Sequence, residues 1–418
     1  MIRADLLVTG IADLATLDGA PAPRIGPAMS DLGRIPDAAL AVDGGRFVYV
    51  GPARAARRSV RLRAGGRRWD LGGAAVVPAF VDPHTHVLFA GDRGREVPEK
   101  LRGRSYGEIA RRGGGLFATV RATRRASRAT LLEESAARLR RMAAQGTATV
   151  EVKSGYALTV AGELRLLELV PLLARRTGLR LVPTFLGAHA VPPEYAGRSD
   201  AYVDLLVRRA LPVVARRRLA RFCDVFCEPG FFSVAQAARL LRAAGRLGLG
   251  TKIHADEFVL SGGARLAAEL SVTSAEHLLA AAPEDRPRLA AAGVTAVLLP
   301  VTPFAALAGR RSPGRELVDA GVPVALGSDC SPNSWIEGMP LVLAFGVYGA
   351  RLTPAEALTA ATVNAAHAVG AESVAGRIAV GRPAEFVAFD LPSVEGLGYR
   401  IDPKPRAILR QGIASFSR

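Results

Sequence analysis

Two histidines one residue apart, His84 and His86, follow an apolar run that begins at Ala74. In a β-strand the side chains of residues i and i+2 point to the same side, so both imidazoles can reach one ion from a rigid backbone. Neutral imidazole is a ligand for divalent transition metals, and water bound to such a metal becomes a nucleophile near neutral pH. The pair therefore predicts half of a metal site.

The other histidines extend this prediction, because three of the remaining four stand in comparable settings. These three are His189, His254 and His277, and Asp329 follows a further apolar segment. A set of three histidines and one carboxylate suits a single divalent transition metal. The sixth histidine, His367, lies in a helix-like segment, where packing explains it better than chemistry.

Eight apolar segments between residues 79 and 370 each lead into polar residues and then into helix-forming sequence. Continuous runs of Val, Ile, Leu and Phe are typical of strands buried on both faces, and helices between them fit parallel crossovers. The segments end near His86, Ser154, His189, Glu228, Asp256, His277, Pro300 and Asp329. This pattern predicts an α/β fold, a (β/α)8 TIM-like barrel, whose strand ends bring five histidines together.

Short strand-like segments separated by glycines occur at both ends of the chain. They cover the first 51 residues and resume after residue 370. We predict that residues 1–78 and 371–418 pair into a small composite β-sandwich domain, and that residues 79–370 form the barrel.

The cysteines and lysines limit the kind of metal centre. The fourth apolar segment ends in Phe226-Cys227-Glu228 and has no lysine, so a two-metal centre bridged by a modified lysine is not expected. Cys223, Cys227 and Cys330 have no short paired spacing that would indicate a cysteine metal site. Cys330 is interpreted as a small packing residue.

A formal net charge of +17 raises the question of a nucleic acid or membrane partner. The arginines are scattered through helix-like stretches such as 138–141, which is typical of solvated helix faces, and no aromatic residues interleave with them. No apolar run approaches the roughly 18 to 20 residues that span a bilayer, and the N-terminus lacks a secretory pattern. We expect a globular cytoplasmic protein without a specific nucleic acid or membrane partner.

The residues around the histidines resemble the amidohydrolase superfamily, and within it the branch of ring-opening hydrolases of histidine degradation. The metal motif alone specifies the superfamily, whereas the block from Tyr106 to Arg124 narrows the resemblance to the branch. The motifs that carry it are His84-Thr85-His86, Gly91-Asp92-Arg93, Ser105 to Ala110, Gly113-Gly114-Gly115, Thr119 to Arg124, Glu151 to Tyr156, Phe185 to His189 and His254 to Glu257.

This resemblance implies one divalent ion, zinc or iron, with a water in its open position. Its ligands would be His84, His86, His254 and Asp329. A bound ion lowers the pKa of water from about 16 toward about 7. The resemblance also implies three catalytic residues, Asp329, Glu257 and His277. Glu257 would carry a proton to the departing ring nitrogen, and His277 would orient the water or stabilise the oxyanion.

The implied substrate is 4-imidazolone-5-propanoate, whose cyclic amide is opened by water to N-formimino-L-glutamate. Its propanoate needs a cation, and Arg93 offers a planar fork that suits a carboxylate. Tyr106, Tyr156 and His189 would hydrogen-bond the ring or its carbonyl. Glu257 would also contact the substrate.

One segment departs from the pattern of this family. After the metal aspartate that pattern commonly reads one residue, Asn, Pro and Gly, whereas Asp329 is followed here by Cys330-Ser331-Pro332-Asn333-Ser334-Trp335. Ser331 still offers a hydroxyl, and Asn333 could restore an amide to the pocket. Both are therefore included among the expected substrate-binding residues.

Two alternatives stay open at this point. The departure after Asp329 keeps another mononuclear amidohydrolase in view, a deaminase or cyclic amidase acting on a different carboxylate-bearing heterocycle. The net charge of +17 leaves a second alternative open, a basic binding protein with a vestigial barrel. A small-molecule substrate and a homodimer are the partners that the first interpretation implies.

Overall fold

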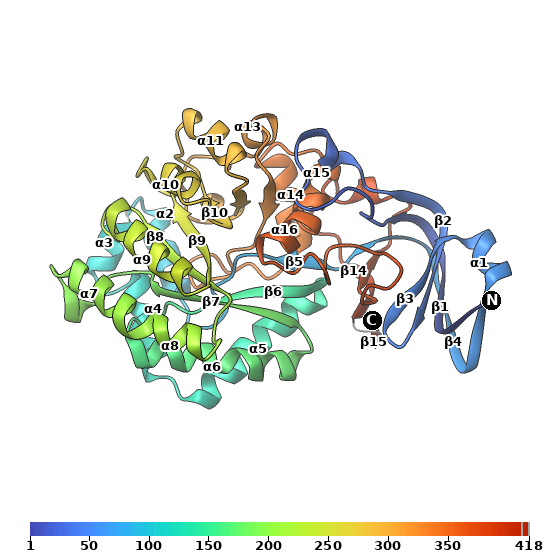
Figure 1. Cartoon of the computed structure of the whole chain (residues 1–418), viewed down its shortest axis with the longest axis horizontal. Helices are drawn as coiled ribbons and strands as arrows, with labels where there is room; N and C mark the ends of the chain where they lie inside the picture. The colour runs from blue at the N-terminus through green and yellow to red at the C-terminus, as the bar shows by residue number, and fades with distance from the viewer. Residues whose placement is uncertain (105, 411–412, 417–418) are drawn as a thin grey trace.

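The computed structural model describes residues 1–104, 106–410 and 413–416. Its strands form two sheets, one of eight parallel strands and one of seven strands. In Figure 1 the eight-stranded sheet and its helices lie at the left, and the seven-stranded sheet lies at the right with both chain termini. The chain thus leaves the terminal sheet once, builds the barrel, and returns.

The eight-stranded sheet is the predicted barrel, and each of its strands ends close to one of the predicted segment ends. Nearly all residues of these strands are buried, as expected for strands covered on both faces. The strands are β5 (Phe80–Asp82), β6 (Thr147–Lys153), β7 (Arg180–Ala188), β8 (Phe222–Cys227), β9 (Gly250–Ala255), β10 (Ser274–His277), β11 (Thr295–Leu298) and β12 (Val324–Leu326). The (β/α)8 prediction is confirmed.

The barrel closes where its first and last strands meet, beyond the hydrogen-bonded part of either strand. Thr85 and Cys330 form an isolated parallel bridge, and the backbone N–H of Asp329 donates to the His84 carbonyl at 3.0 Å. A Cβ on Gly327 would lie 3.1 Å from the Cβ of His84, so glycine permits this close approach. The closure places His84 and Asp329 side by side.

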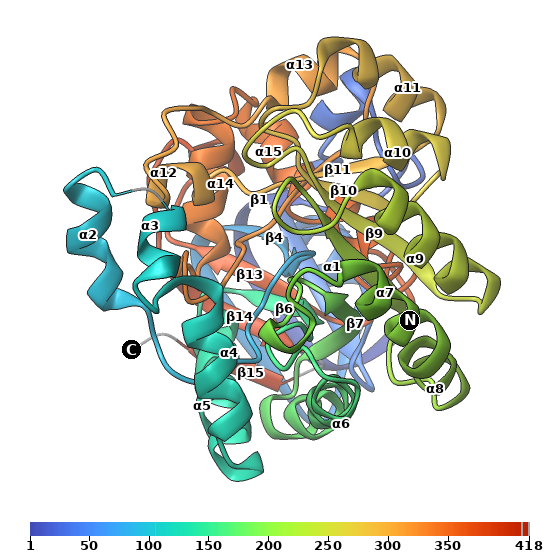
Figure 2. The ribbon, with the colours of Figure 1, turned by 90° about the vertical axis from the view of Figure 1, so that its left-hand side faces the viewer.

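Helices surround the barrel strands, as Figure 2 shows. Some of their ends are capped: Ser233 and Gln236 form a capping box on α9 (Val234–Arg246), and Gly178 ends α6 (Val160–Thr177) in the left-handed conformation. The longer helices are α4 (Gly115–Arg125), α5 (Arg128–Ala144), α6 (Val160–Thr177), α9 (Val234–Arg246) and α14 (Met339–Tyr348). The shorter ones are α1 (Ala53–Ser59), α2 (Val97–Leu101), α3 (Tyr106–Arg111), α7 (Ser199–Leu205), α8 (Leu211–Arg216), α10 (Gly263–Glu269), α11 (Arg286–Ala291), α12 (Thr302–Ala305), α13 (Gly314–Asp319), α15 (Pro354–Ala360) and α16 (Val363–Ala368).

None of the helices in the described ranges is both long and apolar enough to cross a membrane.

The terminal segments form one curled seven-stranded sheet, where a sandwich of two sheets was expected. Its strands are β1 (Ile2–Ala15), β2 (Arg34–Asp43), β3 (Arg46–Pro52), β4 (Val60–Pro78), β13 (Phe386–Phe389), β14 (Pro405–Arg410) and β15 (Ile413–Phe416). Strand β1 pairs with both β2 and β4 and shifts register against each. Such irregularities bend strands locally, so one continuous sheet can curl. The domain division at 78/79 and 370/371 stays a prediction.

The apolar run that leads to His84 serves both sheets. Residues 74–78 end β4, which pairs antiparallel with β13, and β5 of the barrel begins only at Phe80. Pro78 lacks a backbone N–H and therefore cannot continue the ladder as a donor. The run predicted as a single strand is consequently divided between the two sheets.

Candidate metal centre

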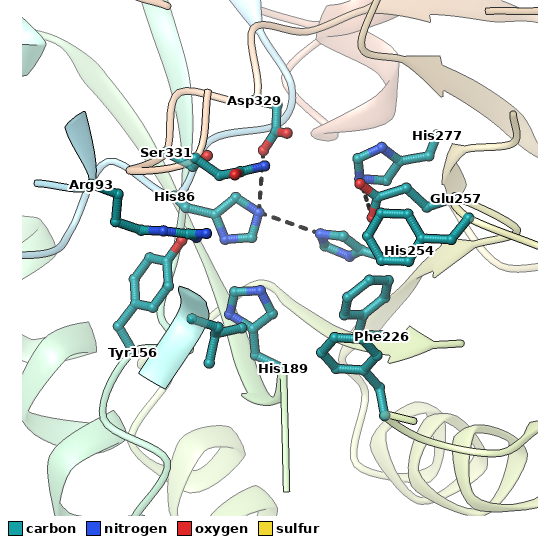
Figure 3. A pocket seen from close by; sticks show the side chains of 14 residues that line it. His86, Arg93, Tyr156, His189, Phe226, His254, Glu257, His277, Asp329 and Ser331 are labelled. Carbon is teal, nitrogen blue, oxygen red and sulfur yellow. Dashed lines mark hydrogen bonds and ion pairs between the residues drawn. The ribbon is translucent and has the colours of Figure 1, made fainter. Parts of the chain in front are cut away.

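The imidazoles of His84, His86 and His254 converge at the carboxyl ends of the barrel strands. Figure 3 shows two of these rings, those of His86 and His254, facing one another. The Nε2 atoms of His84 and His86 are 3.2 Å apart, and those of His86 and His254 are 3.3 Å apart. Nitrogen ligands about 2.1 Å from a tetrahedral zinc ion would be separated by about 3.4 Å. Burial lowers the pKa of His84 and of His86 well below the usual value, which keeps both lone pairs available. These nitrogen atoms could hold one metal ion.

Asp329 supplies a carboxylate to the same point. Its Oδ1 lies 3.7 Å from His84 Nε2 and 3.6 Å from His86 Nε2, while its Oδ2 accepts a hydrogen bond from the Thr302 hydroxyl at 2.9 Å. Burial raises the pKa of Asp329 to about 7, and a nearby cation would favour its ionised form. Its φ of +51° is unusual for a residue with a side chain, as is often found at functional sites.

Two carboxylates behind the centre set the tautomers of the imidazoles. His84 Nδ1 donates to Glu276, and His254 Nδ1 lies 3.0 Å from Asp224 Oδ2. When Nδ1 carries the proton, the Nε2 lone pair faces the centre and can bind a metal. The residues present thus fit a divalent metal in donor type, spacing and tautomer.

Two buried lysines neutralise these carboxylates inside the barrel. Lys153 Nζ lies 2.7 Å from Asp224 Oδ2 and 2.8 Å from Glu151 Oε2, and Lys252 Nζ lies 3.0 Å from Glu151 Oε1. Both lysines also approach Glu276, at 3.4 and 3.5 Å. Although burial opposes ionisation, Asp224 and Glu151 raise the pKa of Lys153. A buried charge of this kind persists only with close partners.

Asp224→Asn is expected to weaken metal binding by about 10- to 100-fold, because an amide cannot accept the His254 proton as strongly as a carboxylate. Equilibrium competition against a chromophoric chelator measures this change. Asp200, whose side chain is 73% exposed, provides the matched control: Asp200→Asn should leave the affinity unchanged. Equal affinity in the Asp224 variant and in the unmodified chain would contradict the assigned role.

Glu257 and His277 face the centre from neighbouring strand ends. Glu257 Oε2 lies 3.6 Å from His277 Nε2, and the Glu257 side chain is 12% exposed. Burial, Asp329 and Glu228 raise the pKa of Glu257 well above its usual value. Burial likewise lowers the pKa of His277. The pair therefore combines an imidazole that favours its neutral form with a carboxyl group that holds its proton more tightly than an ordinary glutamate.

Glu228, at the end of the fourth barrel strand, holds the loop that carries Glu257. Its carboxylate accepts the backbone N–H groups of Glu257, Phe258 and Val259 at 3.0, 3.2 and 2.8 Å. This is the position where the sequence lacks a lysine. Glu228 thus positions the loop that carries the candidate proton carrier.

A cavity of about 60 Å³ opens beside the metal donors. It collects most of the predicted site residues, together with the apolar side chains of Leu116, Phe226, Phe231 and Phe258. The predicted residues on its wall are His86, Arg93, Tyr156, His189, His254, Glu257, His277, Asp329, Ser331 and Asn333. His84 is fully buried beneath them. Tyr106 begins α3, and its side chain lies outside the described part of the structure.

His189 presents a hydrogen-bond acceptor to this pocket. Its Nδ1 lies 3.1 Å from the carbonyl oxygen of Gly155, and a carbonyl only accepts, so Nδ1 carries the proton. Burial lowers the pKa of His189 to about 3, which leaves Nε2 without a proton. The ring stacks on that of His86 with centroids 4.9 Å apart.

Arg93 is fixed by a partner that sequence analysis did not identify. Its Nε and Nη2 donate to Glu96 Oε2 at 2.9 and 2.7 Å, and Glu96 Oε1 accepts the N–H of Gly115 at 2.8 Å. The i,i+3 spacing of Arg93 and Glu96 is the one signal in the sequence that could have shown this pair. Figure 3 shows Arg93 reaching into the pocket near Tyr156.

Comparison with known proteins identifies one family whose members resemble this chain over most of its length. The model of the Amidohydrolase family matches residues 99–410. The chain is 50% identical to the imidazolonepropionase of Symbiobacterium thermophilum, over 94% of this chain and 92% of that protein. It is 44% identical to the imidazolonepropionase of Geobacillus kaustophilus, over 94% and 93%.

Solved structures at lower identity share the fold. An adenosine deaminase from Xanthomonas campestris with bound zinc is 20% identical, with a TM-score of 0.68 over 99% of this chain and 93% of that one. The atrazine chlorohydrolase TrzN from Arthrobacter aurescens, complexed with zinc, is 18% identical, with a TM-score of 0.67 over 98% and 94%.

Proposed function

The chain belongs to the imidazolonepropionase family of amidohydrolases, and on that premise we propose that it hydrolyses 4-imidazolone-5-propanoate to N-formimino-L-glutamate in histidine degradation. The observation that carries the proposal is one pocket in which Arg93 and His189 face the same space as the metal donors. A substrate with a carboxylate arm and a heterocyclic ring needs a cation for the arm, such as Arg93, and a hydrogen-bond partner for the ring, such as His189.

In this proposal His84, His86, His254 and Asp329 hold one divalent ion, zinc or iron. The ion would lower the pKa of a water and polarise the ring carbonyl. Glu276 and Asp224 keep His84 and His254 in the tautomer that the ion needs.

Glu257 transfers the protons of the reaction, and His277 assists it. Glu257 takes a proton from the attacking water, whose oxygen forms a bond to the carbonyl carbon of the ring. The same carboxyl group then gives the proton to the ring nitrogen as the carbon–nitrogen bond breaks. His277, 3.6 Å from Glu257, orients the water or stabilises the negative charge on the carbonyl oxygen.

The remaining pocket residues orient the substrate. Arg93 receives the propanoate, and His189 accepts a hydrogen bond from a ring N–H through Nε2. The proposal also has the hydroxyls of Tyr156 and Ser331 contact the ring or its carbonyl, which is supported by the position of both residues in the cavity lining. Tyr106 belongs to the same proposal by its place in the family motif.

Turnover of the proposed substrate is the first test. Purified protein loaded with zinc or iron is expected to consume 4-imidazolone-5-propanoate and to release N-formimino-L-glutamate, identified by mass spectrometry. A panel of related amino- and oxo-heterocycles, with and without a carboxylate arm, serves as the comparison. Ammonia release from one of these, with no turnover of the imidazolone, would reassign the chain to another amidohydrolase activity.

Arg93→Ala is expected to reduce kcat/KM for carboxylate-bearing substrates by about 10- to 100-fold, which is the value of a charge-assisted hydrogen bond. Substrates without the arm should change little. Steady-state kinetics on both substrate types measures the difference. An equal loss on both types would show that Arg93 acts on the structure of the pocket instead.

A cytoplasmic location and a homodimer complete the proposal. Light scattering coupled to size-exclusion chromatography tests the second point.

A further inference from the structure

Arg93 alone leaves the carboxylate end of the pocket without net charge. Its guanidinium is already paired with Glu96 at 2.7 Å, and both side chains are at most 10% exposed. A substrate carboxylate that joins this pair would bring the local charge to minus one. In a poorly solvated site a group of net negative charge is unfavourable unless another cation lies nearby.

Lys100 in α2 is the cation that the structure offers at this place. Its Nζ donates to Asn333 Oδ1 at 2.9 Å, and Asn333 lines the metal pocket. In the described part of the chain no carboxylate lies at ion-pair distance from this ammonium group. Lys100 is half-buried, and both Arg93 and Glu96 affect its pKa electrostatically. Its positive charge is thus close to Arg93 and not cancelled by an ion pair.

The contact with Lys100 also determines which way the Asn333 amide points. An ammonium group can only donate, so the atom that faces it must be the amide oxygen. The two N–H donors of Asn333 then point away from Lys100. Donors of this kind suit a carboxylate oxygen in the pocket.

A second cavity supports this placement. It measures about 560 Å³, is lined by Lys100 and Leu101, and shares Asn333 and Phe258 with the metal pocket. Asn333 therefore stands at the junction of the two cavities, and Lys100 contacts it from the outer one.

We propose that Lys100 and Asn333 complete the subsite for the carboxylate arm of the substrate, with Lys100 supplying the charge and Asn333 the N–H donors. This inference rests on the proposed function and deepens it. It also accounts for the departure after Asp329, because a glycine at position 333 would have no side chain to contact Lys100. The ligand class is a heterocycle with a flexible carboxylate arm.

The test is Lys100→Met, measured on 4-imidazolone-5-propanoate and on a 4-imidazolone that carries an uncharged alkyl arm. We expect KM for the propanoate to rise about tenfold or more, with kcat nearly unchanged and with KM for the alkyl compound within about twofold. Arg102→Met is the matched control, because Arg102 lies two residues away and is 69% exposed. That variant should keep both KM values.

Asn333 provides a second, independent readout. Asn333→Ala should raise KM for the propanoate, and Asn333→Asp should raise it further, because a carboxylate there would neutralise Lys100 and repel the substrate.

An unchanged KM in Lys100→Met, or an equal rise for both compounds, would overturn the inference. If the unmodified enzyme does not turn over the propanoate, the proposed function fails. Equilibrium binding of imidazole-4-propanoate against 4-propylimidazole then tests the subsite by itself, and a selective loss of the former in Lys100→Met supports it.

Discussion

Removal of the metal with a chelator is expected to lower the rate of ring opening by at least about 10³-fold, because without a cation the pKa of water returns from about 7 to about 16. Restoring one equivalent of zinc or iron per chain should restore the activity. The four donors, His84, His86, His254 and Asp329, lie close enough to serve a single ion. Activity and bound metal, measured together during titration, check this expectation.

His254→Ala tests the same centre without a chelator. The variant loses one of three nitrogen donors and leaves Asp224 without the imidazole that it contacts at 3.0 Å. We expect loss of both bound metal and activity. Full activity in metal-free protein would exclude the proposed chemistry. Saturation at two ions per chain would contradict a mononuclear centre.

The barrel and the metal donors could be predicted because their signals are local. Several apolar strand segments end close to a metal donor, namely His86, His254 or Asp329. Parallel strands in a barrel bring their carboxyl ends to one face. Spacing within a strand places His84 and His86 together without knowledge of any other element. The closure of the barrel beside Asp329, through the bridge between Thr85 and Cys330, is seen only in the structure.

The charges behind the centre could not be predicted in the same way. Lys153 and Lys252 lie in strands, and a lysine or glutamate in a strand is usually read as facing solvent. Their partners, Asp224 and Glu276, are more than twenty residues distant in sequence. Only the barrel geometry shows that these side chains face one another in its interior.

The contact between Lys100 and Asn333 was hidden for the same reason. The two residues are 233 positions apart, and neither has a local pattern that indicates the other. Sequence analysis noted Asn333 as part of the departure from the family pattern and included it among the expected substrate-binding residues, but it did not identify Lys100. The structure turns that departure into a specific contact with a charged group.

Glu257→Gln is expected to reduce kcat by about 10² to 10⁴-fold, the range that a positioned proton carrier contributes. The amide keeps the shape of the side chain but can neither take a proton from water nor return one to the ring nitrogen. Metal stoichiometry should be unchanged, because Glu257 is not among the metal donors. Glu269, exposed at the end of α10, offers a matched control, and Glu269→Gln should keep full activity.

The pH profile separates a proton carrier from a residue that merely shapes the pocket. Burial, Asp329 and Glu228 raise the pKa of Glu257, although a bound cation would lower it again in part. Glu257 must be ionised to accept a proton, so kcat/KM should rise with pH as this group loses its proton. Because the pKa is raised, that rise should lie closer to neutral pH than for an ordinary glutamate. Glu257→Gln should lose this ascending limb, whereas a variant with lower activity and an unchanged limb would assign the proton transfer to another group.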